Sequence, residues 1–181
     1  MSFIRRLMAV GRTAFGDRRA MKVIFVPHCI LNQNARVAGA AERPAAVNEL
    51  ITDLMKRDIG IIQMPCPELV ILGLDRAHLA IRRELEKPEG RSELRKLVKE
   101  LIQQVQQYRR CGVQVLGVLG KNGSPTCGVE ETWYQGVTPG EGVFIEELKR
   151  GLLENNVELR LSGCRDSDPE AALAIVDRWI P

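Results

Sequence analysis

The sequence predicts an α/β fold in which a parallel, doubly wound sheet has helices on both faces. Short, continuous apolar runs rich in β-branched residues have the pattern of strands buried on both sides. The longer stretches between these runs carry apolar residues at the spacing of one helix face. Because the two kinds of segment alternate, we expect a Rossmann-like sheet with its site at the carboxyl edge of the strands.

Three buried strands are expected, each an apolar run followed by a loop that contains proline or glycine. They span residues 22–27, 59–64 and 113–119. A fourth strand is expected over residues 157–161, where apolar residues alternate with Glu158 and Arg160. This alternation is typical of a strand with one solvated face, so we place it at the edge of the sheet.

Helices are expected wherever apolar residues recur at helical spacing between the strands. They span residues 44–57, 92–111, 141–155 and 168–179. Pro44 suits a first helical turn, Gly112 suits the end of the second helix, and Asp168 suits the N-cap of the last. Residues 66–90 fit neither pattern, and we expect a functional loop there with a short helix near residues 77–86.

The composition is that of one globular domain preceded by a basic segment. Of the 181 residues, 45% are hydrophobic and 27% are charged, which is typical of a domain with a sizeable core. The net charge of +3 is concentrated in residues 1–20, a basic N-terminal extension, so the single domain expected over residues 21–181 is nearly neutral. A neutral domain with 4% aromatic residues lacks the basic, stacking surface of most nucleic-acid-binding proteins.

The chain carries no sign of a membrane or secretory protein. No apolar run reaches the ~20 residues of a membrane-spanning helix, and residues 1–20 lack the continuous apolar core of a secretion signal. We therefore expect no membrane span and a cytoplasmic location. In that compartment the five cysteines are expected to be metal ligands, catalytic groups or core residues rather than disulfides.

Three of the cysteines come directly after the three buried strands. Cys29 follows the first strand, Cys66 the second and Cys127 the third. Because parallel strands end at the same edge of a sheet, we expect these thiols to meet at one site. Cys111 precedes its strand and is expected in the core. Cys164 lies beyond the expected edge strand, and its role as a fourth ligand stays open.

Three dispersed thiolates favour one kind of metal centre over another. Thiolates suit both zinc and iron–sulfur clusters, but a structural zinc site usually has four ligands with at least one close pair. These cysteines lie 37 and 61 positions apart, which favours a 4Fe–4S cluster. Three ligands leave one iron open, and an open iron can bind a substrate atom as a Lewis acid.

Several motifs, in this order, resemble the thiouracil desulfidase family of iron–sulfur proteins. They are VPHC at residues 26–29, CPE at residues 66–68 with Gly73-Leu74 after it, and SPTCG at residues 124–128. The stretch at residues 136–153 and the strand after it also resemble the C-terminal half of the family. The resemblance covers roughly residues 21–162.

The resemblance implies an activity and a set of site residues. The activity is a redox-neutral removal of sulfur from a small thiolated molecule, such as a thiopyrimidine of the 2-thiouracil or 4-thiouridine type. Cys29, Cys66 and Cys127 would hold a 4Fe–4S cluster with one open iron, which can be lost in air. Glu68 would activate the attacking water, and Ser124 would hold the pyrimidine or the developing oxyanion.

The loops on the expected substrate side depart from the family pattern. Residues 30–37 (ILNQNARV) stand where the family shows a Leu-Gly and then an Arg-Tyr. Residues 72–78 (LGLDRAH) stand where it shows Gly-Gly-Leu and then Pro-Arg. A divergent branch that acts on another thiolated molecule, or on a thiolated tRNA base, is therefore an alternative.

Two readings from other classes of protein remain. One is a non-catalytic metal- or cluster-binding module or sulfur carrier, which a fourth ligand such as Cys164 would favour because it would close the site. The other is a metal-free enzyme with Cys127 as nucleophile and His28 as its partner. That enzyme would have one unusually reactive thiol. His28 could equally be a cluster ligand, or a loop residue that shields the cluster.

Overall fold

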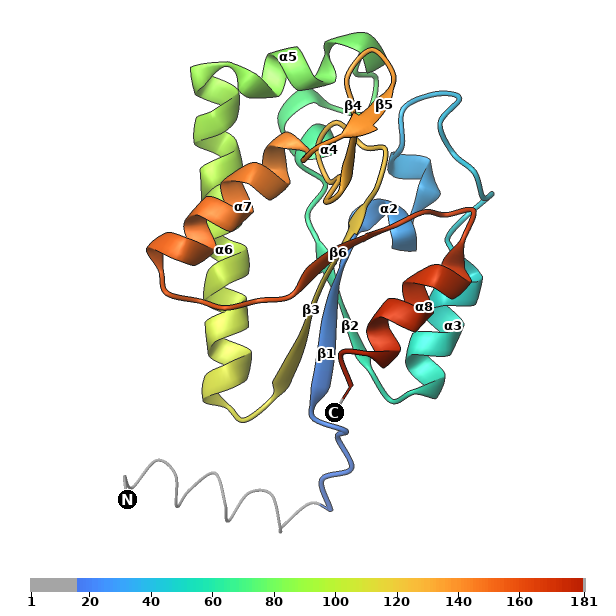
Figure 1. Ribbon diagram of the computed structural model, residues 1–181, viewed down its shortest axis with the longest axis vertical. Coiled ribbons are helices and arrows are strands. Elements are labelled where there is room, and N and C mark those ends of the chain that lie inside the picture. Colours follow the sequence, from blue (N-terminus) through green and yellow to red (C-terminus); the bar gives the residue numbers. More distant parts are fainter. Residues whose placement is uncertain (1–15, 181) are drawn as a thin grey trace.

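Four parallel strands run side by side through the middle of the molecule (Figure 1). The computed structural model describes residues 16–180, so most of the predicted N-terminal extension lies outside the described residues. In order across the sheet, the strands are β2 (Gly60–Met64), β1 (Lys22–Pro27), β3 (Gln114–Lys121) and β6 (Leu161–Cys164). All three strand pairs are parallel, which confirms the predicted sheet.

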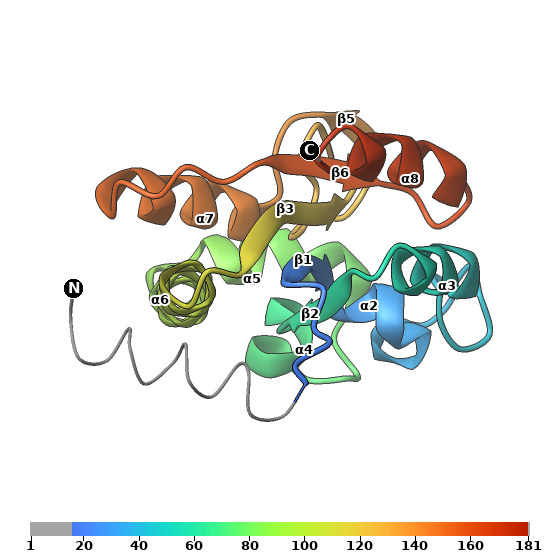
Figure 2. The same cartoon turned by 90° about the horizontal axis from the view of Figure 1, so that it is seen from below.

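Helices cover both faces of this sheet (Figures 1 and 2). One face packs against α5 (Ile81–Glu86), α6 (Pro88–Arg110) and α7 (Val143–Glu154). The other packs against α2 (His28–Leu31), α3 (Asn48–Lys56) and α8 (Pro169–Asp177). Side chains of β1 alternate between the two layers: Phe25 belongs to the first core, and Ile24 and Val26 to the second. This alternation explains why β1 is apolar from Val23 onwards.

The order of the strands creates a place for a site. From β1 the chain moves to β2 on one side, and then returns across β1 to β3 on the other. The helices of these two connections, α3 and α6, lie on opposite faces. In sheets of this kind a crevice opens beyond the carboxyl ends at the point where the strand order reverses. The loops after β1 and β3 border that crevice.

The first long helix starts later than predicted. It begins at Asn48, and Pro44 lies in the preceding irregular segment. Backbone hydrogen bonds to the loop after β1 explain the difference. Ala45 O accepts from Gln33 N at 2.7 Å, and Val47 N donates to Ile30 O at 2.9 Å. These bonds hold the segment against α2 in a non-helical course.

The predicted functional loop over residues 66–90 is mostly helical. It contains α4 (Pro67–Leu72), the 3₁₀ helix η2 (His78–Ala80) and α5, so only the short helix near residues 77–86 was predicted correctly. Helix α6 then begins at Pro88, earlier than expected. Pro67 and Pro88 are each the first residue of a helix, where proline is favoured because that N–H has no helical partner.

The remaining differences concern strands. The edge strand is β6, and it begins at Leu161 instead of ending there. The segment just before β6 contacts β3 through a backbone hydrogen bond, which Val118 N donates to Arg160 O at 2.8 Å. A hairpin of β4 (Glu131–Trp133) and β5 (Val137–Pro139) was not predicted, because three-residue strands are too short to show a period.

No helix within residues 16–180 is long and apolar enough to cross a bilayer.

Candidate functional site

Cys29, Cys66 and Cys127 line one cavity of about 80 Å³ at the carboxyl edge of the sheet. Cys29 lies in the first turn of α2, directly after β1. Cys66 is the residue before α4 and follows β2. Cys127 lies in the loop between β3 and β4. The sequence therefore predicted correctly that these residues converge, and their role as ligands stays a prediction.

Cys127 is buried, Cys29 and Cys66 are half-buried, and neighbouring thiols influence the pKa values of Cys29 and Cys127. Burial raises the pKa of Cys127 well above its ordinary value of 9.0, and the neighbouring Cys66 and Cys29 raise it further. Burial raises the pKa of Cys29 to about 12, with Arg36 acting in the opposite direction. Burial and then Glu68 raise the pKa of Cys66.

Protonated thiols at neutral pH have two consequences. A metal or cluster can bind here only if it displaces their protons. A metal-free nucleophilic cysteine, in contrast, requires a lowered pKa. The raised pKa values of Cys29, Cys66 and Cys127 therefore disfavour the metal-free nucleophile.

Ser124 shapes the loop that carries Cys127. Its Oγ accepts hydrogen bonds from the backbone N–H groups of Thr126 at 3.1 Å and Cys127 at 3.0 Å. This is the local side-chain-to-backbone turn that serine favours. Among the described residues, the Ser124 hydroxyl donates to no acceptor. Its proton is therefore free for a molecule in the cavity, which Ser124 lines.

The N-terminus of helix α7 binds the loop that carries Cys127. The first N–H groups of the helix have no partner inside it. Val143 N donates to Pro125 O at 3.0 Å, and Phe144 N donates to Thr126 O at 3.0 Å. The backbones approach so closely that a Cβ on Gly142 would lie 2.3 Å from the carbonyl carbon of Thr126. Position 142 therefore requires glycine.

Glu68 connects two of the cysteine-bearing loops. It lies in the first turn of α4 and lines the cavity. Its Oε1 accepts from Thr126 Oγ1 at 2.7 Å, and its Oε2 pairs with Arg76 Nε at 3.0 Å. Arg76 also donates to Ala35 O at 2.7 Å, in the segment after Cys29. Arg76 and Thr126 thus fix Glu68, and sequence reasoning missed both.

The signals for these two residues were weak. Arg76 lies in a segment that departs from the family pattern, where a charged residue looks like ordinary surface. Its side chain is only 3% exposed. Thr126 is one residue of the SPTCG motif and lies beside the predicted ligand Cys127. Its hydroxyl could have been suspected only because a fully buried threonine needs a hydrogen-bond partner.

A second cluster of charged side chains lies at the cavity, near the ends of β3 and β6. Arg36 and Lys121 belong to the cavity wall. Behind them lies Asp166, which follows β6 and is fully buried. Its Oδ2 accepts from Arg36 Nη1 at 2.5 Å and from Gln33 Nε2 at 3.0 Å. Lys121 Nζ lies 3.4 Å from both Asp166 Oδ1 and Glu42 Oε1. This cluster was not predicted from the sequence.

His28 and His78 both line the same cavity. The other two cysteines, Cys111 and Cys164, do not line it. His28 Nε2 is 3.5 Å from Asn32 Nδ2. The exposed His78 packs against Trp133, with ring centroids 4.6 Å apart and the ring planes tilted by 43°. Cys164 is buried in the α3–α8 core, where its Sγ donates to Gly120 O at 3.1 Å. Cys111 is exposed at the end of α6, so its predicted place in the core was wrong.

The three thiols are the kind of donor set that a 4Fe–4S cluster requires. Within residues 16–180, no group of three or more His, Cys, Asp or Glu side chains is placed to hold one ion. A 4Fe–4S cluster needs a wider arrangement, because each cysteine binds a different iron. Three thiol donors from three separate loops around one cavity match that donor set.

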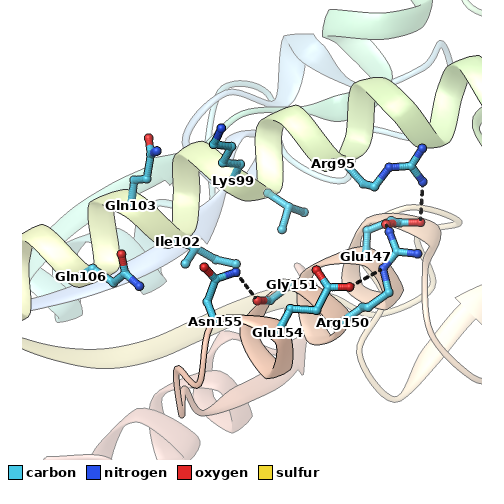
Figure 3. A pocket seen from close by; sticks show the side chains of 11 residues that line it. Arg95, Lys99, Ile102, Gln103, Gln106, Glu147, Arg150, Gly151, Glu154 and Asn155 are labelled. Atoms are coloured by element: carbon cyan, nitrogen blue, oxygen red, sulfur yellow. Dashed lines mark hydrogen bonds and ion pairs between the residues drawn. The ribbon is translucent and has the colours of Figure 1, made fainter.

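A roomier cavity of about 390 Å³ lies elsewhere, between α6 and α7 (Figure 3). Its walls carry charged and amide side chains, such as Arg95, Glu147 and Arg150, over an apolar floor that includes Ile102. No cysteine lines it. The chemistry-bearing residues therefore belong to the smaller cavity at the sheet edge.

Comparisons with known proteins agree with the motifs. A family model described as 2-thiouracil desulfurase matches residues 24–159. An uncharacterized protein of Methanocaldococcus jannaschii is 30% identical over 142 residues, which cover 78% of this chain and 85% of that protein. No solved structure matches the chain. All five predicted site residues lie within the matched segment, whereas Asp166 follows it.

Proposed function

Because the chain belongs to the 2-thiouracil desulfurase family, we propose that it removes sulfur from a thiolated pyrimidine in a redox-neutral reaction. The observation that carries this proposal is the convergence of three thiols, Glu68 and Ser124 on one cavity. Overall, a C=S group and water give a C=O group and hydrogen sulfide, so no electrons are gained or lost. A thiolated base in tRNA is the alternative substrate, and the proposed location is cytoplasmic.

Cys29, Cys66 and Cys127 would hold a 4Fe–4S cluster, whose open iron would supply a Lewis acid for the thiocarbonyl sulfur. The chain itself acts on the carbon and oxygen atoms. Glu68 accepts a proton from the water that attacks the thiocarbonyl carbon. The charge of its carboxylate is compensated by Arg76 at 3.0 Å, which also fixes its orientation. The Ser124 hydroxyl donates a hydrogen bond to a carbonyl oxygen of the pyrimidine or to the oxyanion that develops.

The test is made on protein purified without air. We expect about four irons per chain, as for one 4Fe–4S cluster, and sulfide release from 2-thiouracil or 4-thiouridine in step with loss of the thiocarbonyl absorbance. A variant with Cys111→Ser, an exposed cysteine at the other end of β3, is the control. A fully loaded protein that releases no sulfide from any thiolated pyrimidine would contradict the proposed substrate class. A protein that binds no iron under these conditions would contradict the cluster.

A further inference from the structure

His78 stands at the mouth of the cavity at the sheet edge. Of the described residues that line this cavity, only His78 is exposed, and the others are buried or half-buried. The thiols lie further in, since Cys127 is buried and Cys29 and Cys66 are half-buried. A substrate whose sulfur reaches the thiols therefore leaves the rest of its ring nearer the mouth, where His78 can contact it.

The imidazole of His78 is held by an aromatic neighbour. Its ring centroid lies 4.6 Å from that of Trp133, and the two ring planes are tilted by 43°. Within residues 16–180 the His78 side chain forms no hydrogen bond or ion pair, so the contact with Trp133 is what holds the ring. The pair lies outside both hydrophobic cores, and packing of the core therefore does not explain it.

Trp133 belongs to a hairpin that is tied to the loop of Ser124. Thr132, the residue before Trp133, donates from Oγ1 to Ser124 O at 3.3 Å. The same Oγ1 accepts from Arg82 Nη1 at 3.1 Å, and Arg82 lies in α5, which follows the 3₁₀ helix of His78. These bonds connect both halves of the ring pair to the loop whose hydroxyl is proposed to hold the substrate.

The rest of the cavity wall has a polar and an apolar part. Glu68 and Ser124 supply polar groups, whereas Val37, Ala40 and Ile81 contribute apolar surface. A pyrimidine is divided in the same way, because its carbonyl and N–H groups lie along its edge and its two faces are apolar. Aromatic side chains bind such faces by stacking, whatever groups the edge carries.

We infer that His78, held by Trp133, stacks on the ring of the substrate, so that the site prefers a planar thiolated ring to a saturated one. This inference rests on the proposed function and adds a specificity-determining residue to it. Trp133 does not line the cavity, and it is a positioning residue that acts through His78. His78 belongs to residues 72–78, the segment that departs from the family pattern.

The experiment compares 2-thiouracil with 5,6-dihydro-2-thiouracil. The two compounds carry the same thiocarbonyl, carbonyl and N–H groups, but saturation of the C5–C6 bond makes the second ring puckered and less suited to stacking. Because they also differ in intrinsic reactivity, the quantity measured is the ratio of their kcat/KM values, compared between each variant and the wild type. Sulfide release from cluster-loaded protein gives both values.

Removal of the His78 ring should reduce the preference for the planar compound. His78→Ala should lower the ratio by about fivefold to a hundredfold, the range for a base stacked on an aromatic side chain. The loss should appear in KM rather than kcat, because a stacked ring is bound equally in the ground state and the transition state. His78→Phe keeps a flat ring without its nitrogens, so the ratio should stay within about twofold of wild type.

Trp133→Leu tests the positioning role of the indole. This variant should lower the ratio by a smaller factor than His78→Ala, and the double variant should be no worse than His78→Ala alone, because Trp133 acts only through His78. Additive losses would overturn the positioning role.

Tyr134→Ala is the matched control. This ring is exposed and follows Trp133 on the same hairpin, but it does not line the cavity, so its removal should leave the ratio unchanged. Iron content and thermal unfolding are measured for every variant, so that loss of the cluster or of the fold is not mistaken for a change in specificity.

The outcomes separate this inference from the proposed function. An unchanged ratio in His78→Ala overturns the inference, and so does an equal loss in His78→Ala and His78→Phe. If no thiolated compound is turned over, the proposed function fails, and binding of uracil and 5,6-dihydrouracil to the same proteins is measured by calorimetry. Tighter binding of uracil that is lost in His78→Ala and kept in His78→Phe supports the inference. Equal binding of the two compounds, or binding of neither, overturns it.

Discussion

Glu68 is the residue whose surroundings say most about its chemistry. Both carboxylate oxygens have partners from other loops, Thr126 on one side and Arg76 on the other. The carboxylate is therefore oriented before any substrate arrives, which is what a general base requires. Its side chain is 13% exposed, so a water molecule in the cavity can still reach it.

Replacing Glu68 by glutamine should separate catalysis from cluster binding. Glu68→Gln keeps the size and can still accept from Thr126, but it cannot take a proton near neutral pH. We expect normal iron content and a loss in kcat of about a hundredfold to ten-thousandfold, measured as sulfide release. Thr126→Val, which removes only the hydrogen bond to Glu68, should give a smaller loss. Full iron content with near-normal turnover in Glu68→Gln would remove Glu68 from the mechanism.

Cys164 gives a residue-scale prediction about pH. Burial, and then the neighbouring Asp166, raise the pKa of Cys164 from 9.0 to about 12. The folded chain thus holds this proton more tightly than the unfolded chain. The contribution to stability is complete below pH 9 and is lost as the pH rises towards 12.

Comparison with Cys164→Ala isolates this effect, because the other thiols are present in both proteins. In cluster-free protein, the difference in unfolding free energy between wild type and Cys164→Ala should change in favour of the variant by about 1.4 kcal/mol per pH unit between pH 9 and 12. Urea unfolding at several pH values measures it. A difference that does not vary with pH would show that folding does not raise the pKa of the Cys164 thiol.

Among the elements, the contact between α7 and the SPTCG loop positions the site most directly. The start of the helix donates to Pro125 O and Thr126 O, and Cys127 follows at once. The docking requires a residue without a side chain at position 142, where a Cβ would meet three backbone atoms at 2.3–2.7 Å. Backbone atoms cannot move aside as a flexible side chain can.

Gly142→Ala should therefore disturb both stability and the site. Overpacking of this kind costs about 1–3 kcal/mol, and the displaced loop should also lower iron content. Gly60→Ala is the control, because its Cβ would meet Val23 Cγ1 at 3.2 Å, a side-chain atom that can shift. We expect thermal unfolding and iron analysis to show a clear loss for Gly142→Ala and a small one for Gly60→Ala. Equal behaviour of the two variants would mean that the loop and helix are not held rigidly together.

The elements also show what the sequence could predict. The strands β1, β2 and β3 are continuous apolar runs and the large helices have long, strong periods, so their existence and the positions of Cys29, Cys66 and Cys127 after the strands could be predicted. Helix α4 and the β4–β5 hairpin are too short to show a period. The partners Arg76 and Asp166 come from distant segments, and only the fold determines which charged residues become buried beside a cavity.

At the scale of the whole molecule, the site depends on the strand order. The reversal between β1 and β3 opens the crevice, and no single loop contributes more than one of the three thiols. Cys111 lies between α6 and β3, at the opposite end of the sheet, and Cys164 faces the α3–α8 core. The fold thus divides the cysteines into three that share a cavity and two that do not.

This division predicts the iron content of single variants. Cys127→Ser should remove most of the iron from anaerobically reconstituted protein, because one iron of the proposed cluster loses its ligand. Cys111→Ser should leave the iron content unchanged, since that thiol is exposed and remote from the cavity.

Cys164→Ser decides between an open and a closed site. Its Sγ already donates to Gly120 O, so we expect iron content close to wild type there as well, measured with turnover on the same samples. Loss of iron in Cys164→Ser equal to that in Cys127→Ser would make Cys164 a fourth ligand, and the protein would then be a carrier rather than an enzyme.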